Sequence, residues 1–171
     1  MRPNIKSKLY QLTWHDDVEI LEANLKGQPF GKHAHDAFSI GVIEDGVGGY
    51  DYRGGKNVFP KGALTLMNPD ELHNGYALST VLKYKMLYVS EREVKDLLGE
   101  KLTGFKEFSP EDREGRVGNS LRNISKRVEL KGHKGWRLAI DAELTYLIQH
   151  VFTMSGGMPL VEGWKESRVI T

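Results

Sequence analysis

The sequence contains no cysteine among its 171 residues. Disulfides and thiolate metal sites are therefore excluded, and the absence of cysteine fits a reducing compartment. No apolar run approaches the roughly 18 residues that a membrane-spanning helix needs. The polar, basic stretch 1–10 also lacks the apolar core of a signal peptide. We therefore expect a cytoplasmic protein with no membrane partner.

The sequence also lacks a marked excess of charge of either sign. It has 24 Lys and Arg residues against 23 Asp and Glu residues, a formal net charge of +1, and no long block of like charge. A surface that neutralises nucleic-acid phosphates needs a basic face, so we do not expect this chain to bind DNA by itself. A hydrophobic fraction of 39% over this length predicts one domain with one substantial core.

Short apolar runs separated by glycine turns dominate the first half of the chain. The residues from 33 onward alternate with a period of two, which is typical of strands with one buried face. Gly54 and Gly55 predict a two-residue hairpin turn, because both tolerate a positive φ. We expect a loose arm at 1–10, a polar loop at 68–75, and strands at about 18–25, 37–43, 48–53, 56–59, 63–67 and 78–89. Strands of this length and spacing predict an all-β barrel or sandwich.

The periodicity becomes helical after the last of these strands. Ser90 and Glu93 form a capping-box pattern that starts a short helix ending at Gly99. The stretch 109–112 predicts a second helix start, with Pro110 in the first turn. Two longer helices, ending near 131 and 154, should lie antiparallel because their connection is short. The predicted fold is mainly β with C-terminal helices: a barrel over about 8–100 and an antiparallel helix pair over about 109–154 within one domain, 1–155, followed by a linker at 156–171.

Three histidines are the first candidates for chemistry. His33 and His35 are two residues apart, so on a strand both imidazoles point to one face. His73 follows the next apolar run, and a curled sheet would bring it close to them. Three converging imidazoles could hold a divalent metal ion, with water completing the site. The other interpretation is that they form hydrogen bonds at the barrel mouth or contact an organic ligand.

The spacing of the first two histidines resembles the first signature of the cupin superfamily. In a metal-binding cupin, a glutamate follows the second histidine by four or five residues. Here those positions hold Ser39 and Ile40. The resemblance implies a cupin-like, jelly-roll barrel, and it leaves any metal site without its carboxylate ligand.

The strand after His35 has two dissimilar faces. One face carries small or polar residues, including Ala37, Ser39 and Gly41, and the other carries Phe38, Ile40 and Val42. If the small face points inward, it leaves a cavity wide enough for one small ligand. If the apolar face points inward, it fills the barrel. The sequence leaves both arrangements open.

Several further side chains are candidate ligand contacts. Tyrosines combine an apolar ring with a polar tip, which suits a binding pocket. Trp14 and His15 could lie over the barrel as a lid. The full set of predicted ligand-binding residues is His33, His35, Ser39, Tyr50, Tyr52, His73 and Tyr84, and the possible metal ligands are His33, His35 and His73.

A longer pattern resembles the N-terminal domain of AraC-type transcriptional regulators. It comprises His33 to Asp36, Glu44 to Gly46, Pro60 to Gly62 and the block Asn68 to Gly75. The order of barrel first and helices second resembles the family over nearly the whole chain. The resemblance implies a domain that binds a small effector and dimerises, followed in the full-length protein by a helix-turn-helix domain that binds DNA. Thr171 would then fall between the two domains.

The final helix predicts a homodimer. Its apolar residues span a wider arc than one barrel face requires, so part of the arc could contact a second copy. The predicted interface residues are Leu138, Leu144, Leu147, Ile148 and Val151.

Two alternatives to a non-enzymatic sensor remain at the sequence level. A small metal-dependent cupin enzyme, such as an isomerase or dioxygenase, would use the three histidines as ligands. A binding module for carbohydrates or other small molecules would need no regulatory role.

Overall fold

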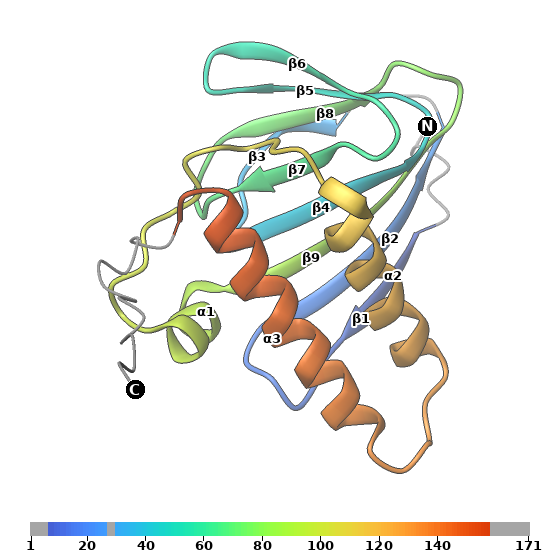
Figure 1. The fold of residues 1–171 in the computed structure, drawn as a ribbon. Helices are drawn as coiled ribbons and strands as arrows, with labels where there is room; N and C mark the ends of the chain where they lie inside the picture. The colour runs from blue at the N-terminus through green and yellow to red at the C-terminus, as the bar shows by residue number, and fades with distance from the viewer. Residues whose placement is uncertain (1–6, 27–29, 158–171) are drawn as a thin grey trace, which may run out of the picture.

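The computed structural model describes residues 7–26 and 30–157, which form two antiparallel sheets followed by helices (Figure 1). The predicted mainly β fold with C-terminal helices is confirmed. The strands are β1 Lys8–Gln11, β2 Val18–Leu25, β3 Phe30–His33, β4 Ala37–Asp45, β5 Gly48–Tyr52, β6 Gly55–Phe59, β7 Leu64–Met67, β8 His73–Ala77 and β9 Leu82–Ser90. The helices are α1 Glu91–Leu98, the 3-10 turn η1 Arg113–Gly115, α2 Arg116–Glu129 and α3 Trp136–Met154.

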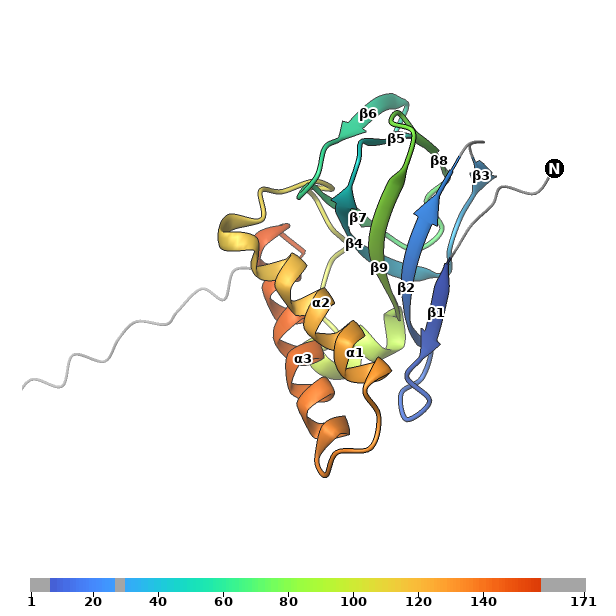
Figure 2. The same ribbon diagram turned by 90° about the vertical axis from the view of Figure 1, so that its right-hand side faces the viewer.

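The strands form two sheets rather than one continuous barrel. The five-stranded sheet has the order β1-β2-β9-β4-β7, and the four-stranded sheet has the order β3-β8-β5-β6. Figure 2 shows α2 and α3 against one face of the five-stranded sheet, with the four-stranded sheet beyond its other face. The molecule therefore has three layers, with a pair of facing sheets beside a helical layer.

The two faces of β4 belong to two different hydrophobic cores. Phe38, Ile40 and Val42 lie in a core shared with α2 and α3. The opposite face, which carries Ser39, Gly41 and Ile43, points to the other sheet, and Ile43 belongs to the second core there. The structure thus decides the question that the sequence left open: the large apolar face of β4 packs under the helices, and the small face leaves room between the sheets.

Helices α1 and α2 each begin next to a side chain that accepts N–H groups of the first turn. Ser90 accepts a hydrogen bond from the backbone N–H of Glu93 at 3.2 Å, so the predicted cap of α1 is confirmed. The predicted start of α2 near residue 110 is wrong, because α2 begins at Arg116. The carboxylate of Asp112 accepts the N–H groups of Val117 and Gly118, both at 2.9 Å. It therefore satisfies donors of the first turn from a position before the helix.

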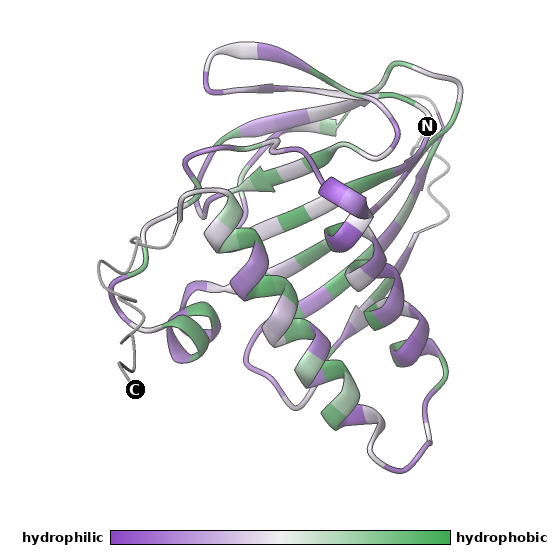
Figure 3. Cartoon of the chain, in the orientation of Figure 1, coloured by the Kyte–Doolittle hydropathy of each residue, from purple (hydrophilic) through white to green (hydrophobic). Residues whose placement is uncertain are grey.

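Helices α2 and α3 run side by side in opposite directions, as the short connection between them predicts (Figures 1 and 2). Figure 3 shows that α3 is hydrophobic over much of its surface, whereas α2 carries more hydrophilic residues. Four of the five predicted interface residues on α3 are buried in the chain's own core, at 0–1% exposure: Leu144, Leu147, Ile148 and Val151. The prediction that these four bind a second copy is wrong. Leu138, at 74% exposure, faces outward.

Three other details of the strands differ from the sequence prediction. Part of the predicted loose arm forms β1, which pairs with β2 at the edge of the sheet. Part of the predicted polar loop forms β8, which pairs with both β3 and β5. The hairpin turn is formed by Arg53 and Gly54, both with positive φ, while Gly55 already pairs with Tyr52. The first six residues of the predicted arm and residues 158–171 of the predicted linker lie outside the described residues.

Helix α3 is the longest helix of the part that the structure describes, and neither it nor any other described helix combines the length and apolar character needed to cross a bilayer.

Candidate functional site

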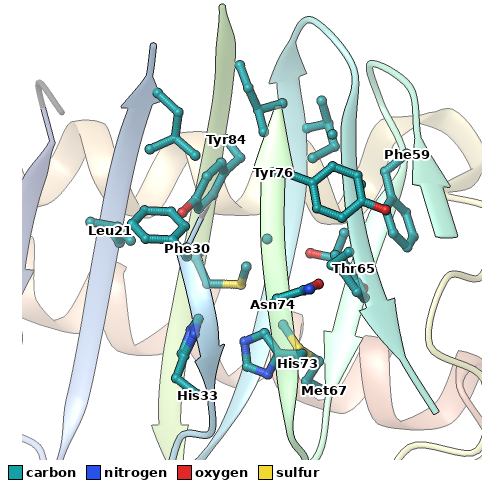
Figure 4. A pocket seen from close by; sticks show the side chains of 18 of the residues that line it. Leu21, Phe30, His33, Phe59, Thr65, Met67, His73, Asn74, Tyr76 and Tyr84 are labelled. Carbon is teal, nitrogen blue, oxygen red and sulfur yellow. The ribbon is translucent and has the colours of Figure 1, made fainter. Parts of the chain in front are cut away.

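A cavity of about 260 Å³ lies between the two sheets. Figure 4 shows its side chains converging from both sheets, with the phenyl ring of Phe59 apart from the imidazoles of His33 and His73. The ring of Phe30 lies edge-on to that of His33, with the centroids 6.3 Å apart. Its walls are largely apolar and aromatic, and its polar groups are imidazoles, hydroxyls and one amide. No Asp, Glu, Lys or Arg side chain lines it among the described residues. The cavity therefore offers neutral recognition groups on an apolar background.

The three predicted histidines converge at this cavity. His33 and His73 are paired across β3 and β8, and their ring centroids lie 4.4 Å apart. The ring of His35 lies 4.9 Å from that of His33 and 5.3 Å from that of His73. One ring nitrogen from each of the three lies within 4.8 Å of the others. The curled arrangement that the sequence predicted for these imidazoles is present.

Backbone carbonyls fix the tautomers of two of these rings. Nδ1 of His33 lies 2.8 Å from the carbonyl oxygen of Gly31, and Nδ1 of His73 lies 3.0 Å from that of Glu71. A carbonyl oxygen only accepts, so Nδ1 carries the proton in each neutral ring. Each Nε2 then presents a lone pair and has no hydrogen-bond partner among the described residues.

Burial keeps two of the imidazoles neutral at physiological pH. Burial lowers the pKa of His35, and the neighbouring His33 and His73 lower it further. Burial also lowers the pKa of His73, and this effect outweighs the hydrogen bond to the carbonyl of Glu71. Neutral imidazole is the form that accepts a hydrogen bond or binds a metal ion.

The donor set fits a divalent metal ion in part. Histidines that bind metals usually donate their other N–H to a carbonyl or carboxylate, as His33 and His73 do. Ligand atoms on one tetrahedral ion lie about 3.4 Å apart at bond lengths of about 2.1 Å, so the 4.8 Å spread would have to contract. No carboxylate lines the cavity in the part of the chain that the structure describes. His33, His35 and His73 are thus the residues that would hold such an ion, with water as the remaining ligand.

Hydroxyl groups line the rest of the cavity. Tyr84 and Tyr88 lie on the same face of β9, and Thr65 comes from β7. Burial raises the pKa of Tyr84 to about 12 and also raises that of Tyr88, so both phenols stay protonated. None of the three hydroxyls has a hydrogen-bond partner among the described residues. They are free to contact a bound molecule.

Two glycines help to keep the cavity open. A Cβ on Gly49 would collide with the ring of Tyr76, and a Cβ on Gly41 would lie 2.5 Å from the hydroxyl oxygen of Thr65. A side chain at either position would push a lining residue out of place. The glycines therefore set the shape of the walls.

Five of the seven predicted ligand-binding residues line the cavity: His33, His35, Tyr50, His73 and Tyr84. Ser39 and Tyr52 do not line it. Ser39 is fully buried, and its hydroxyl has no partner. The hydroxyl of Tyr52 donates instead to the carboxylate of Glu71. Burial, strengthened by Glu71, raises the pKa of Tyr52 above its usual range.

The sequence prediction missed much of the lining. The missed residues with a periodic signal are Met86 and Tyr88, which share a strand face with Tyr84. The missed residues of β8, including Asn74 and Tyr76, fell in the stretch predicted to be a loop. Phe30, Phe59 and Met67 carried no pattern that marked them as ligand contacts rather than core.

Trp14 and His15 do not form a lid over the cavity. His15 lies between two carboxylates, with Nδ1 at 2.5 Å from Glu93 of α1 and Nε2 at 2.6 Å from Asp141 of α3. The indole N–H of Trp14 donates to the same Asp141 at 2.7 Å. These two residues therefore tie the loop after β1 to the helices.

The facing sheets and the cavity between them, with its uncharged lining, define a β domain with a pocket of the size of a small molecule. The chain belongs to the family of AraC-like ligand binding domains, whose family model matches residues 15–148. A search of curated proteins found no match.

Solved structures of similar fold include several cupins. A conserved protein of unknown function from Streptococcus pyogenes is 19% identical, with a TM-score of 0.46 over 53% of this chain and 77% of that chain. A cupin superfamily protein from Desulfitobacterium hafniense is 13% identical, with a TM-score of 0.45 over 53% of this chain and 83% of that chain. A cupin 2 conserved barrel domain protein from Leptotrichia buccalis is 19% identical, with a TM-score of 0.47 over 53% of this chain and 43% of that chain.

Proposed function

We propose that this chain is the effector-sensing and dimerisation domain of a cytoplasmic AraC-type transcriptional regulator. A small molecule binds between the sheets, and its presence is passed to a helix-turn-helix DNA-binding domain outside this chain. The chain itself catalyses no reaction. The observation that carries the proposal is a continuous hydrogen-bond network from the imidazole of His73 in the cavity to the end of α3, within a chain of this family.

The network starts at Glu71, in the loop between β7 and β8. Its backbone carbonyl accepts from Nδ1 of His73 at 3.0 Å. Its carboxylate accepts from the hydroxyl of Tyr52 and from the guanidinium of Arg53, the latter at 3.2 Å. The same carboxylate accepts the backbone N–H of Asn68 at 3.0 Å. Glu71 therefore joins a cavity histidine to three groups behind the cavity wall.

Asn68 carries the network out of the sheets. Its side-chain oxygen accepts the N–H of Phe105 at 2.6 Å, and its side-chain nitrogen donates to the carbonyl of Phe105 at 3.1 Å. Arg53 donates to the carbonyls of Phe105 and Lys106, both at 3.3 Å. Two side chains behind the cavity wall thus hold the backbone of the segment between α1 and α2.

This segment is bonded directly to the end of α3. The N–H of Thr103 donates to the carbonyl of Gly157 at 2.8 Å, and the N–H groups of Lys106 and Glu107 donate to the carbonyl of Ser155 at 3.1 and 3.2 Å. A ligand that moves His73 would therefore shift a chain of contacts that ends where α3 ends. Coupling between two sites requires an element that has two arrangements, and binding of the ligand must favour one arrangement over the other.

The experiment uses the full-length regulator with its DNA-binding domain. Asn68→Ala removes the two contacts with Phe105 but lies outside the cavity lining. We expect ligand binding to persist and the ligand-dependent change in DNA binding to fall severalfold. Asn57→Ala is the matched control, because Asn57 contacts only backbone carbonyls within the β5–β6 hairpin. A normal response in Asn68→Ala would contradict the proposed route.

Dimerisation is proposed through the outer face of α3. Leu138 is 74% exposed and Tyr146 is 46% exposed, and Ala142 lies exposed between them at helical spacing. We propose this uncharged stripe of Leu138, Ala142 and Tyr146 as the dimer interface, in place of the four buried residues that the sequence predicted. Light scattering at high protein concentration should show a dimer that Leu138→Asp converts to a monomer, and a monomeric native chain would contradict the proposal.

A metal-dependent enzyme is the second candidate, favoured by the three converging imidazoles. Metal analysis of untagged protein separates the two candidates. Stoichiometric metal that is lost in His35→Ala and retained in His133→Ala would favour the enzyme. A metal-free chain that still binds its ligand would favour the sensor.

A further inference from the structure

We propose that the cavity takes a neutral one- or two-ring aromatic molecule whose hydroxyl group donates a hydrogen bond to a free imidazole nitrogen. This inference rests on the proposed function and names the class of its effector. Four features of the cavity carry it: volume, lack of charge, aromatic walls and unpaired acceptors.

The volume fits one or two rings. A cavity of about 150 Å³ lined by apolar residues holds benzene. The cavity between the sheets has about 260 Å³. A substituted benzene or a fused bicyclic ring therefore fits without expansion of the sheets.

The lining excludes charged and heavily hydroxylated ligands. No Lys or Arg lines the described part of the cavity, so a carboxylate or phosphate would be buried without a counter-charge. No Asp or Glu lines it either, so a cationic ligand would lack a counter-charge. A sugar would bury several hydroxyls against mostly apolar walls, and each unpaired hydroxyl is costly.

Aromatic rings form much of the apolar wall of the cavity, next to Leu, Ile and Met side chains. Figure 4 shows the ring of Phe30 beside that of Tyr84 in one part of the cavity, and the ring of Tyr76 beside that of Phe59 in another. The ring of Tyr50 stacks on Phe59 with centroids 4.3 Å apart. Aromatic side chains bind planar ligand rings through stacked and edge-to-face contacts. These walls favour an aromatic ligand over an aliphatic one of equal size.

The polar part of the cavity presents acceptors that need a donor. Nε2 of His33 and Nε2 of His73 carry lone pairs, because each Nδ1–H is used by a backbone carbonyl. His73 is only 6% exposed, yet it lines the cavity. Thr65, at 3% exposure, adds a hydroxyl that has no partner among the described residues. A ligand O–H can donate to these imidazole nitrogens, whereas an ether oxygen in the same place can only accept, and only from a hydroxyl such as that of Thr65.

The test compares two neutral probes, of which the second is the O-methyl ether of the first and therefore lacks the donor. p-Cresol has a phenolic O–H, and 4-methylanisole has a methoxy group instead. Calorimetry and thermal shift are run on the chain with a chelator present, so that no metal occupies the imidazoles. We expect p-cresol to bind and to raise the melting temperature, and 4-methylanisole to bind about tenfold more weakly, because it offers the acceptors no hydrogen bond. Benzoate and L-arabinose should cause no shift.

A variant of His73 tests whether its imidazole accepts the hydrogen bond from the ligand. His73→Phe should weaken p-cresol about tenfold and leave 4-methylanisole unchanged. His133→Phe, in the exposed α2–α3 connection, should change neither. Equal loss for both probes in His73→Phe would show a structural role and contradict the assignment.

Other outcomes overturn the ligand class. Equal affinity of p-cresol and 4-methylanisole, or no binding of either, would overturn it even if the histidine variant fails to fold. A shift with benzoate or L-arabinose instead would overturn the class and leave the sensor function standing. A different experiment tests the sensor function. Met86→Trp fills the cavity, and the sensor function is contradicted if the ligand-dependent change in DNA binding of the full-length protein stays the same in this variant.

Discussion

His33 of β3 and His73 of β8 are directly paired across the four-stranded sheet, and each uses Nδ1 to bond a backbone carbonyl. The two rings therefore present the same nitrogen, Nε2, to the cavity. The register of β3 against β8 shifts between Phe30 and His33, just before this pair, and such irregularities commonly re-aim side chains near functional sites. The orientation of the imidazoles is thus set by backbone geometry before any ligand arrives.

The first prediction concerns these tautomers. Long-range proton–nitrogen NMR at pH 8 should show both His33 and His73 with the proton on Nδ1. The physical reason is that the carbonyls of Gly31 and Glu71 can only accept a hydrogen bond. His133, which is exposed, provides the reference for an imidazole in free exchange between tautomers. Protonation of Nε2 in either cavity ring would contradict the structure.

The second prediction concerns the shape of the cavity. Gly49→Ala places a Cβ against the ring of Tyr76, so we expect a loss of about 1 to 3 kcal/mol of stability or a displaced ring with weakened ligand binding. Gly55→Ala is the control, because the nearest atom to its new Cβ is the carbonyl oxygen of Tyr52 at 3.8 Å. Denaturant unfolding and ligand titration of both variants provide the comparison. Identical behaviour of the two would show that Gly49 does not shape the wall.

The third prediction separates the two faces of α3. Leu147→Ala should cost about 2 to 5 kcal/mol of unfolding free energy, because Leu147 is fully buried in the core shared with the sheet. Leu138→Ala makes the same chemical change on an exposed position and should cost about 0.5 kcal/mol or less in the monomer. Urea denaturation at low protein concentration measures both. A large loss for Leu138→Ala under these conditions would mean that this side chain is not free in the monomer.

The fourth prediction concerns pH and His15. Burial lowers the pKa of His15, but the hydrogen bonds to Asp141 and Glu93 outweigh it, so the folded pKa lies above the usual 6.5. A pKa raised by folding gives stability that is fully present below the unfolded pKa and is lost as the pH rises through the folded pKa. His15→Gln should therefore cost about 1.5 to 3 kcal/mol at pH 6 and less at pH 9. Urea unfolding of both proteins at the two pH values measures this, and a cost that grows with pH would refute it.

The sequence predicted the parts of the fold that local patterns determine. The strands β4 to β7 and β9 follow the two-residue alternation, and α1 follows its cap at Ser90. The turn at Arg53 and Gly54 was displaced by one residue, because adjacent glycines allow either register. Strand β8 was missed, because its ladder partners come from distant parts of the chain and its own residues are half polar.

The candidate site was predictable to a similar degree. Histidine spacing identified all three imidazoles, since a shared strand face and a curled sheet bring them together. Which apolar residues of α3 stay exposed was not predictable, because a helix with a wide apolar arc does not reveal which part the chain's own sheet covers. Leu144 and Leu138 are the same residue type on one helix, yet only the packing of α2 and the sheet determines that the first is buried. The cluster of His15 with Glu93 and Asp141 joins three distant segments, which leave no local signal.

The central claim is that the space between the sheets is a small-molecule site, and methionine methyl NMR tests it most directly. Met67 and Met86 line the cavity, whereas Met154 lies at the end of α3 and packs against the other core. Titration with p-cresol should move the methyl signals of Met67 and Met86 in a saturable way and leave that of Met154 in place. A saturable shift of Met154 alone, or no shift of either cavity methionine, would contradict the account.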